Sequence, residues 1–291
     1  MRAFSRSHAQ RGFTLVEAIV VIVITGIIAA GVAVFIRAPV EGYVDSVARA
    51  ELTDAADTAL RRLSRDVNAA LPNSLRQGPG NACIEFLPTL GGGRYRAAQT
   101  SGGAGDILDF TLNDLAFDVL AANGLPPTGG FAGTSAVVYN LGIAGANAYN
   151  PADRNRAAIN AGASNVGLIT LTAANQFPFR SPGNRFQVIQ NASVVYYCAG
   201  NAVWRATRAL PAGAALGVPA ACPQADFVGP TMLVGNVDCA QTGFAYDAAP
   251  FAAVSQRNGI LALTLVLTQA ASAGLFETLS LYQEVQVDNT P

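Results

Sequence analysis

The feature that most constrains the fold is an unbroken apolar run near the N-terminus. From Phe13 to Ile36 the chain reads FTLVEAIVVIVITGIIAAGVAVFI, with Glu17 as its single charged residue. As an α-helix rising about 1.5 Å per residue, the run spans roughly 36 Å, enough to cross the hydrocarbon core of a bilayer. Residues 1–12 hold no acidic residue and three arginines, Arg2, Arg6 and Arg11. Because basic flanks stay cytoplasmic, the sequence predicts a membrane helix with the rest of the chain outside.

A secretory signal peptide and a plain signal anchor are the alternative interpretations of this N-terminus. A signal peptide has a shorter apolar core, followed by small residues at the cleavage site. Here the small residue Gly12 precedes the apolar run, so cleavage after it would leave the helix on the mature chain. Glu17 bears on the choice, because a carboxylate so close to hydrocarbon is costly and usually has a partner. Taken alone, it is equally compatible with a boundary side chain that reaches the headgroups.

The string from Arg11 to Glu17, RGFTLVE, followed by an apolar helix, resembles the prepilin signature of type IV pilins and type II secretion pseudopilins. The resemblance covers residues 11–36 and implies roles for individual residues. Gly12 would be the last residue of a leader that prepilin peptidase removes, and Phe13 the N-methylated mature N-terminus. Glu17 would pair during assembly with the N-terminal amine of a neighbouring subunit. Such pairing suits two groups that are each costly to bury alone.

The helix is predicted to continue beyond the membrane, with residues 13–36 as its transmembrane part and 37–71 as its amphipathic part. Val34 stands where the family often has proline, whereas Gly26 matches a family glycine, so we expect any kink near Ala38–Pro39. The predicted head-facing residues recur at helical spacing: Val44, Val47, Ala48, Leu52, Ala55, Leu60, Leu63, Val67 and Leu71. The i,i+4 pairs Asp45–Arg49 and Asp57–Arg61 are interpreted as solvating the outer face.

Residues 72–291, called the head below, are predicted to be β-rich and to lie outside the cytoplasm. Short β-type runs alternate there with glycine-rich turns. The predicted strands are Cys83–Leu87, Ile107–Leu112, Ala136–Leu141, Val166–Leu171, Arg185–Ile189, Ser193–Cys198, Val203–Arg208, Met232–Val237, Ile260–Leu267 and Thr278–Val287. Loops are predicted at Gly91–Gly93, Ser101–Gly105, Ile143–Ala163 and near Ala271–Gly274. The predicted fold class is therefore α+β, a long N-terminal helix packed on an antiparallel sheet.

The amino-acid composition lacks residues that most kinds of catalytic site require. The 18 basic residues are all arginine, and the single histidine is His8, inside the predicted leader. Without lysine there is no Schiff base or phosphate-loop amine, and one histidine leaves little for acid–base or metal chemistry. The formal net charge of −1 gives no basic field for nucleic acid. We therefore expect no enzyme activity, cofactor, metal or nucleic-acid partner.

Four cysteines follow the apolar run: Cys83, Cys198, Cys222 and Cys239. They contain no CxxC pair and have no histidine to complete a zinc site. An even number of widely spaced cysteines in an exported domain indicates disulfides, and four buried free thiols are the alternative. Three pairings are possible, and the spacing does not choose among them.

Two further groups of residues can be interpreted either as a binding site or as ordinary structural residues. Asn150, Asp153 and Asn155 offer closely spaced oxygen ligands, but they lack an EF-hand pattern and a following glutamate, so loop polar residues are the preferred interpretation. Trp204 and the pair Tyr196–Tyr197 fall on adjacent predicted strands. They could form a sugar platform, although core packing of a hairpin is preferred because large aromatics dominate cores.

Several head segments resemble minor pilins of MSHA-pilus biogenesis, of the MshO type, which are similar to the J-type minor pseudopilins of type II secretion. The segments are ALPNS (70–74), CIEFLPT (83–89), GGRYR (92–96), VYNLG (138–142), SPGNRFQV (181–188), VYYC (195–198), Trp204–Arg205 and QVDN (286–289). The resemblance implies the pairing Cys198–Cys239, which leaves Cys83–Cys222.

The resemblance also implies a function in assembly rather than catalysis. The chain would be a minor pilin in the inner membrane, with a periplasmic head, that primes or tips a pilus. Its implied partners are prepilin peptidase, which is also the N-methyltransferase, other minor and major pilins, the inner-membrane assembly platform and membrane lipid. A type II secretion minor pseudopilin, a membrane-anchored adhesin and an anchored enzyme are the alternatives.

Overall fold

The computed structural model describes residues 12–247, 258–270 and 276–291. The chain divides into two compact units, and each is described by itself. The first runs through Glu51 and includes Ala270–Phe276, and the second comprises Leu52–Gln269 and Glu277–Pro291. The predicted leader up to Arg11 and the turn predicted near Ala271–Gly274 lie outside the described residues.

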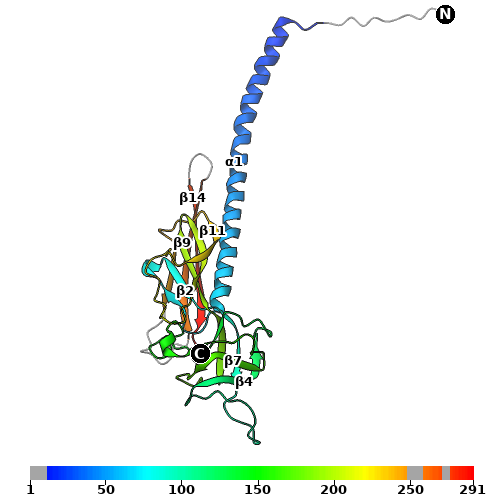
Figure 1. Cartoon of the computed structure of the whole chain (residues 1–291). Helices are drawn as coiled ribbons and strands as arrows, with labels where there is room; N and C mark the ends of the chain where they lie inside the picture. Colours follow the sequence, from blue (N-terminus) through cyan, green and yellow to red (C-terminus); the bar gives the residue numbers. More distant parts are fainter. Residues whose placement is uncertain (1–11, 248–257, 271–275) are drawn as a thin grey trace, which may run out of the picture. The chain divides into compact units, whose positions relative to one another are not determined.

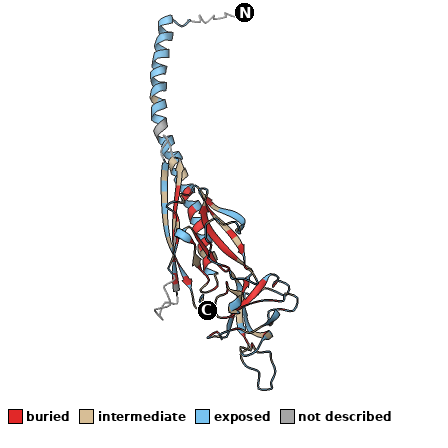
Figure 2. Ribbon diagram, turned by 60° about the vertical axis from the view of Figure 1, so that its left-hand side comes forward, coloured by how far each residue is buried: buried red, intermediate tan, exposed pale blue. Residues whose placement is uncertain are grey.

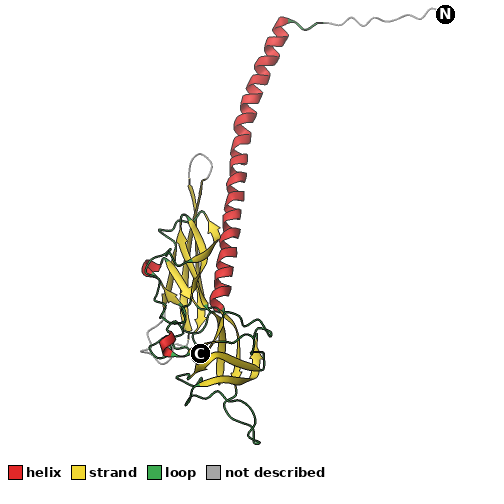
Figure 3. Cartoon of the chain, in the orientation of Figure 1, coloured by secondary structure: helices red, strands yellow, loops and turns green. Residues whose placement is uncertain are grey.

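One long helix, α1 (Leu15–Asn68), forms the N-terminal part of the described chain (Figure 1, Figure 3). The predicted continuous helix is confirmed, although it ends at Asn68 rather than at Leu71. Beyond Asn68 the backbone joins the sheet instead, because the Leu71 amide donates to the Leu87 carbonyl over 2.7 Å. Pro39 lies inside α1, which continues on both sides of it, and a kink there stays a prediction.

The first half of α1 is apolar and exposed, as the pale-blue helix in Figure 2 shows. Among the described residues, α1 is the one helix long and apolar enough to cross a membrane. Val44 and Val47, which were predicted to pack on the head, are also exposed, and that part of the prediction is wrong. The cluster that buries the helix begins at Leu52 within the described part of the chain. An exposed apolar surface of this extent needs a cover of lipid or protein.

Two antiparallel sheets bury the C-terminal part of α1, which confirms the α+β fold class. The five-stranded sheet has the order β1-β2-β9-β10-β11 and the three-stranded sheet the order β12-β13-β14. Their strands are β1 (Arg76–Gln77), β2 (Cys83–Phe86), β9 (Ala192–Ala199), β10 (Ala202–Ala209), β11 (Val228–Gly235), β12 (Gly243–Asp247), β13 (Asn258–Ala270) and β14 (Phe276–Asp288).

One hydrophobic cluster joins α1 to the inner faces of both sheets. The helix contributes Leu52, Ala56, Ala59, Leu60, Leu63 and Val67. The sheets contribute alternate residues of their strands, such as Ile84 of β2, Tyr196 of β9 and Leu263 of β13. Between Leu52 and Val67 the predicted helical spacing is thus confirmed, except that Ala55 is exposed and Ala56 takes its place. The apolar residues of the helix, three or four positions apart, pack against the alternate apolar residues of the strands in this cluster. This packing holds the helix against the sheets.

A third, six-stranded sheet is inserted in the sequence between β2 and β9, which themselves pair directly, Cys83 with Tyr197 and Phe86 with Val194. Its order is β6-β5-β8-β3-β4-β7. The strands are β3 (Thr89–Tyr95), β4 (Asp114–Asn123), β5 (Thr134–Val137), β6 (Arg156–Ala158), β7 (Leu168–Asn175) and β8 (Arg185–Gln190). A bridge between Ile159 and Leu171 joins the two outer strands and closes the sheet on itself. Residues 89–190 are therefore called the inserted barrel.

The inserted barrel has its own aromatic core. Its largest buried side chains are Tyr95, Phe117, Phe131, Phe177 and Phe186. The rings of Phe117 and Phe186 meet edge to face, with centroids 5.2 Å apart and planes at 80°. Edge-to-face pairs of this kind add stability beyond the area they bury.

Two sequence predictions in the barrel are wrong for identifiable reasons. The glycines Gly91–Gly93 lie inside β3 rather than in a loop. A Cβ on Gly92 would lie 2.6 Å from the Phe186 carbonyl oxygen, and one on Gly93 would lie 2.7 Å from the Ala121 carbonyl oxygen. Glycine is needed in β3 because its neighbouring strands approach so closely. The predicted strand Ile107–Leu112 is instead a turn, in which Asp109 accepts hydrogen bonds from the amide and hydroxyl of Thr111.

The remaining predicted strands overlap observed ones, although their bounds shift. The sequence missed β1, β4 and β12, and the predicted loop Ile143–Ala163 contains β6 and a short 3₁₀ helix, Pro151–Asp153. The predicted Ala136–Leu141 strand ends at Val137, because Tyr139 adopts a positive φ of 52°. Ser101–Gly105 is a loop, as predicted.

Candidate processing and assembly site

Thr14 determines where α1 begins. The amide of Glu17 donates to the Thr14 hydroxyl over 3.3 Å, and the amide of Ala18 donates to the Thr14 carbonyl over 3.1 Å. Thr14 is therefore the N-cap of α1. With glutamate three residues later, the sequence Thr-Leu-Val-Glu has the pattern of a capping box. A threonine three residues before a glutamate was the signal available in the sequence for this cap.

Gly12 and Phe13 precede the cap and are not helical. Both are exposed, and Phe13 keeps 75% of its surface accessible. The Gly12–Phe13 peptide bond thus lies in accessible non-helical chain immediately before a capped helix. Glu17 is also exposed, in the first turn of α1, where the helix dipole favours negative charge.

Residues 7–33 match the family model of the prokaryotic N-terminal methylation motif. This N-terminus is type IV prepilin-like. The matched residues include the Gly12–Phe13 junction, Glu17 and the larger part of the apolar run. The motif indicates a type IV pilin-like or pseudopilin-like protein, and the apolar helix that carries it fits membrane anchoring. No curated protein and no solved structure matches the chain.

At the C-terminal end of α1, Asp66 fixes the helix to the five-stranded sheet. Its Oδ2 accepts a hydrogen bond from the Tyr196 hydroxyl over 2.7 Å and lies 2.9 Å from Nε of Arg205. Burial, reinforced by the hydrogen bond to Asp66, raises the pKa of Tyr196, so its hydroxyl stays protonated and donates. The helix is therefore held to the sheet by directed polar contacts as well as by apolar packing.

The four cysteines form two disulfides, Cys83–Cys222 and Cys198–Cys239. These are the pairs that the resemblance to minor pilins implied. The first joins β2 to the loop between β10 and β11, and the second joins β9 to the segment before β12. Both cross-links therefore start from the adjacent strands β2 and β9.

A buried charge cluster beside the first disulfide was not predicted from the sequence. Glu85 of β2 is fully buried, and its Oε2 lies 2.7 Å from Arg76 and 3.4 Å from Arg208. Its Oε1 accepts a hydrogen bond from the Ser193 hydroxyl over 2.5 Å. Arg208 also lies 2.5 Å from Asp226. The signal was present, because a lone carboxylate in the otherwise apolar strand Cys-Ile-Glu-Phe needs a partner.

The two arginines of this cluster also hold the loop of residues 210–227 over the outer face of the five-stranded sheet. Arg76 donates to the carbonyl of Leu216 over 2.8 Å, and Arg208 donates to the carbonyl of Gly217 over 2.7 Å. A third arginine, Arg156 of β6, donates to the Pro211 carbonyl over 2.7 Å. Burial lowers the pKa of Arg156 to about 10, so it still carries its charge at neutral pH. These groups are engaged in structure rather than offered to a ligand.

Of the candidate calcium ligands, Asn150 and Asp153 are used within their own loop. Asn150 accepts a hydrogen bond from the Ala152 amide and donates to Asp153, and Asp153 also accepts one from the Asn147 amide. Asn155 is fully buried and donates to Asn140, whereas its own Oδ1 has no hydrogen-bond partner among the described residues. The contacts of Asn150 and Asp153 are the hydrogen bonds that loop polar residues make, which agrees with the preferred interpretation for these two residues.

The aromatic residues of β9 and β10 pack in the body of the head. Tyr196 and Tyr197 are buried, on opposite faces of β9, and Trp204 is half-buried on β10, directly opposite Tyr197. The Trp204 indole donates to the Ala199 carbonyl over 2.9 Å. Core packing of the hairpin, the preferred interpretation, is confirmed over a sugar platform.

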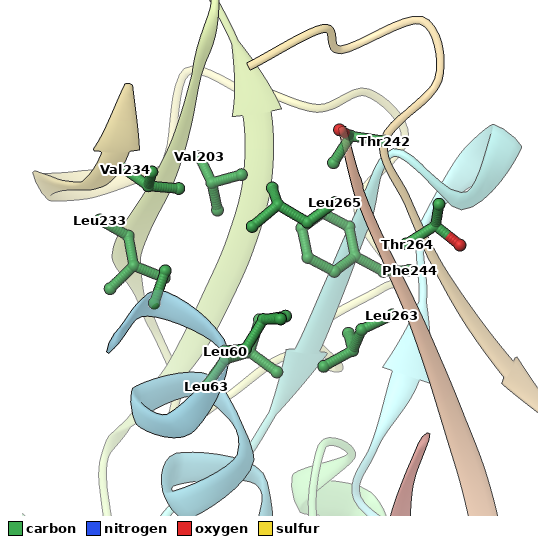
Figure 4. Close-up of a pocket in the computed structure, with 11 residues that line it drawn as sticks. Leu60, Leu63, Val203, Leu233, Val234, Thr242, Phe244, Leu263, Thr264 and Leu265 are labelled. Carbon is green, nitrogen blue, oxygen red and sulfur yellow. The ribbon is translucent and has the colours of Figure 1, made fainter. Parts of the chain in front are cut away.

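A pocket lies between α1 and strands of both the five-stranded and the three-stranded sheet (Figure 4). Its walls come from α1, from β10 and β11, and from β12 and β13. The lining residues are Ala59, Leu60, Leu63, Val203, Leu233, Val234, Thr242, Phe244, Leu263, Thr264 and Leu265. The Thr242 hydroxyl already accepts a hydrogen bond from the Val266 amide. Because none of these lining residues has a titratable side chain, the pocket suits apolar packing and has no group for acid–base chemistry.

Proposed function

We propose that this chain is a minor type IV pilin of the MSHA type, which primes or tips pilus assembly after its leader is removed. Its role is structural rather than catalytic. The observation that carries the proposal is the methylation motif at residues 7–33, placed at the start of an exposed apolar helix. The resemblance of head segments to MshO-type minor pilins supplies the finer assignment.

Prepilin peptidase would cut between Gly12 and Phe13 and then methylate the new amine. The position of Thr14 supports this step, because the helix begins only after this cap and the bond to be cut lies just before it, in non-helical chain. Removal of residues 1–12 would leave Phe13 as the N-terminal residue, just before the membrane helix. The helix would remain in the inner membrane, with the head in the periplasm, until the assembly platform moves the subunit into a filament.

Glu17 would act in assembly, through the N-terminal amine of the next subunit. The carboxylate lies on an exposed turn, among apolar side chains that a filament would cover. A buried carboxylate and a buried amine are each costly, and pairing removes most of that cost. Charge pairing would therefore select the axial position of each incoming helix, while apolar burial would supply the affinity.

Processing is tested by measuring the N-terminal mass of the chain, expressed with and without prepilin peptidase. The expected product with the enzyme lacks residues 1–12 and carries one added methyl group on Phe13. A Gly12→Leu variant is the matched control and should stay uncut, because a bulky side chain replaces the small residue at the cut. An intact Met1 terminus in cells with active enzyme would contradict the proposal.

Replacing Glu17 with alanine should leave cleavage largely unchanged and reduce association with other pilins by about tenfold or more, the scale of a lost buried charge pair. The measurement is co-purification of partner pilins from detergent-solubilised membranes. Glu17→Gln is the matched variant, since it keeps the shape and removes the charge. Co-assembly of either variant at the wild-type level would count against the pairing role.

A type II secretion minor pseudopilin of the J type remains the second candidate, because the same N-terminal motif indicates pilin-like and pseudopilin-like proteins. A membrane-anchored adhesin is less well supported. That alternative requires exposed aromatic residues around Trp204, whereas Tyr196 and Tyr197 are buried.

A further inference from the structure

Two arginines of the inserted barrel face each other on neighbouring strands. Arg94 of β3 and Arg185 of β8 are directly opposite in the antiparallel pairing of these strands, and both are exposed. Opposed residues in such a pairing have Cβ atoms about 5 Å apart, and like charges at that separation destabilise a sheet. The fold therefore gains nothing from placing two cations side by side. These two residues are called the arginine pair.

The other arginines in the described part of the head all have partners, which are carboxylates, amide or carbonyl oxygens, or an aromatic ring. These arginines are Arg76, Arg96, Arg154, Arg156, Arg180, Arg205 and Arg208. The arginine pair makes no hydrogen bond, ion pair or ring contact with any described residue. Two guanidinium groups held side by side without partners suit an oxyanion from outside the chain, because each can offer two parallel N–H groups to it.

The outward face beside the arginine pair is polar and has a glycine at its centre. Phe186, which lies opposite Gly93, belongs to the barrel core, so the flanking residues of β3 and β8 face outward. In the next row along the strands, Gly92 lies between Gln187 of β8 and Asn123 of β4. The glycine leaves a floor without a side chain, and the two amides can donate and accept hydrogen bonds. The backbone of a ligand can therefore approach closely over β3.

The spacing of the two rows matches that of an extended peptide. Residues two apart on a strand are separated by about 7 Å, so this distance separates the arginine pair from the row of Gly92. Alternate side chains on one face of an extended segment have the same spacing. A segment lying along β3 can thus place one carboxylate at the arginine pair and its next outward side chain over the amides. A nucleic acid fits less well, because two arginines on a chain of net charge −1 release few counterions.

We propose that the arginine pair binds a carboxylate in an extended acidic segment of a partner protein, and that this segment lies along β3 over Gly92. The site belongs to the inserted barrel and does not depend on the cut after Gly12, so the inference goes beyond the proposed function. The two arginines select the acidic side chain, while the amides of Gln187 and Asn123 fix the register of the segment. Because both arginines are exposed, binding weakens as salt is added.

The test measures the fluorescence anisotropy of labelled peptides mixed with the full chain in a zwitterionic detergent. The probe is a peptide in which serine and glutamate alternate, and the comparison peptide has the same composition with its glutamates adjacent. The alternating peptide should bind more tightly, because its glutamates share one face at the spacing of the two rows.

Arg94→Gln/Arg185→Gln should weaken binding of the alternating peptide by about tenfold or more, the effect of losing a charge-assisted contact. Arg62→Gln/Arg65→Gln, at two exposed arginines of α1, is the matched control. It removes the same charge from the chain and should bind the peptide like the wild type.

The urea midpoint of Arg94→Gln/Arg185→Gln separates binding from folding. Because this variant removes two opposed like charges, its midpoint should equal or exceed that of the wild type. A lower midpoint would show that the arginine pair serves the fold, which would overturn the inference.

Three binding results would also overturn the inference. They are unchanged affinity in Arg94→Gln/Arg185→Gln, equal affinity for the two peptides, and binding of inorganic phosphate alone, which would mean an adventitious ion only. If polygalacturonate binds more tightly than the alternating peptide through the same arginines, the site takes an acidic glycan and the assignment to a protein segment is wrong.

Discussion

Replacing Glu85 with leucine is expected to lower the free energy of unfolding by about 3–5 kcal/mol, the usual cost of breaking one side of a buried ion pair. The Glu85 side chain is fully buried, and Arg208 beside it is only 6% exposed. Removing the carboxylate leaves Arg76 without its ion-pair partner, and both arginines lose the charge that offsets their desolvation. A leucine of similar size fills the space but compensates neither arginine.

The loss can be measured by urea denaturation of the full chain in detergent, followed through the fluorescence of Trp204, the single tryptophan. Asp57→Leu is the matched control, since it breaks an exposed ion pair that is worth about 1 kcal/mol or less. Glu85→Gln should fall between the two, because it keeps a hydrogen-bond acceptor for Ser193 and removes the charge. If Glu85→Leu costs no more than Asp57→Leu, the cluster does not stabilise the fold.

The second large effect is expected from Cys83→Ala/Cys222→Ala, which removes the disulfide with a sequence separation of 139 residues. In the chain-entropy model, a cross-link of that span stabilises by up to about 5 kcal/mol. The other disulfide, Cys198–Cys239, spans 41 residues and stabilises by up to about 4 kcal/mol on the same model. The wider cross-link should therefore matter more.

Urea midpoints of the two double variants, measured beside the wild type, check this order. Adding a reductant to the wild type should lower its midpoint below that of either variant, because both cross-links are then lost. Equal midpoints for the two variants, or the reverse order, would contradict the chain-entropy account.

The N-terminal part of the chain could be predicted from the sequence, because its signals are local. An apolar run, a small residue before it and one embedded glutamate are all features of neighbouring residues. The spacing of Leu60, Leu63 and Val67 likewise predicts which side of the helix is buried, since helix periodicity depends only on sequence distance.

The head was less predictable, because its architecture depends on pairings between distant residues. Nothing near Cys83 indicates that β2 pairs with β9 more than a hundred residues later in the sequence. The glycines of β3 are typical of a turn when considered alone, and only the approach of β4 and β8 makes them strand residues. The partners of Glu85 come from β1, β9 and β10, so the cluster exists only once the sheet has formed.

The direct pairing of β2 with β9 has a mechanical consequence. The chain leaves the five-stranded sheet after Phe86, forms the inserted barrel, and returns at Ala192 beside the point where it left. Tension applied to the barrel would therefore pull both strands in the same direction and share the force between them. Cys83 and Cys198 lie toward the opposite end of that strand pair, so the pull would reach two covalent bonds before it could strip the sheet from α1.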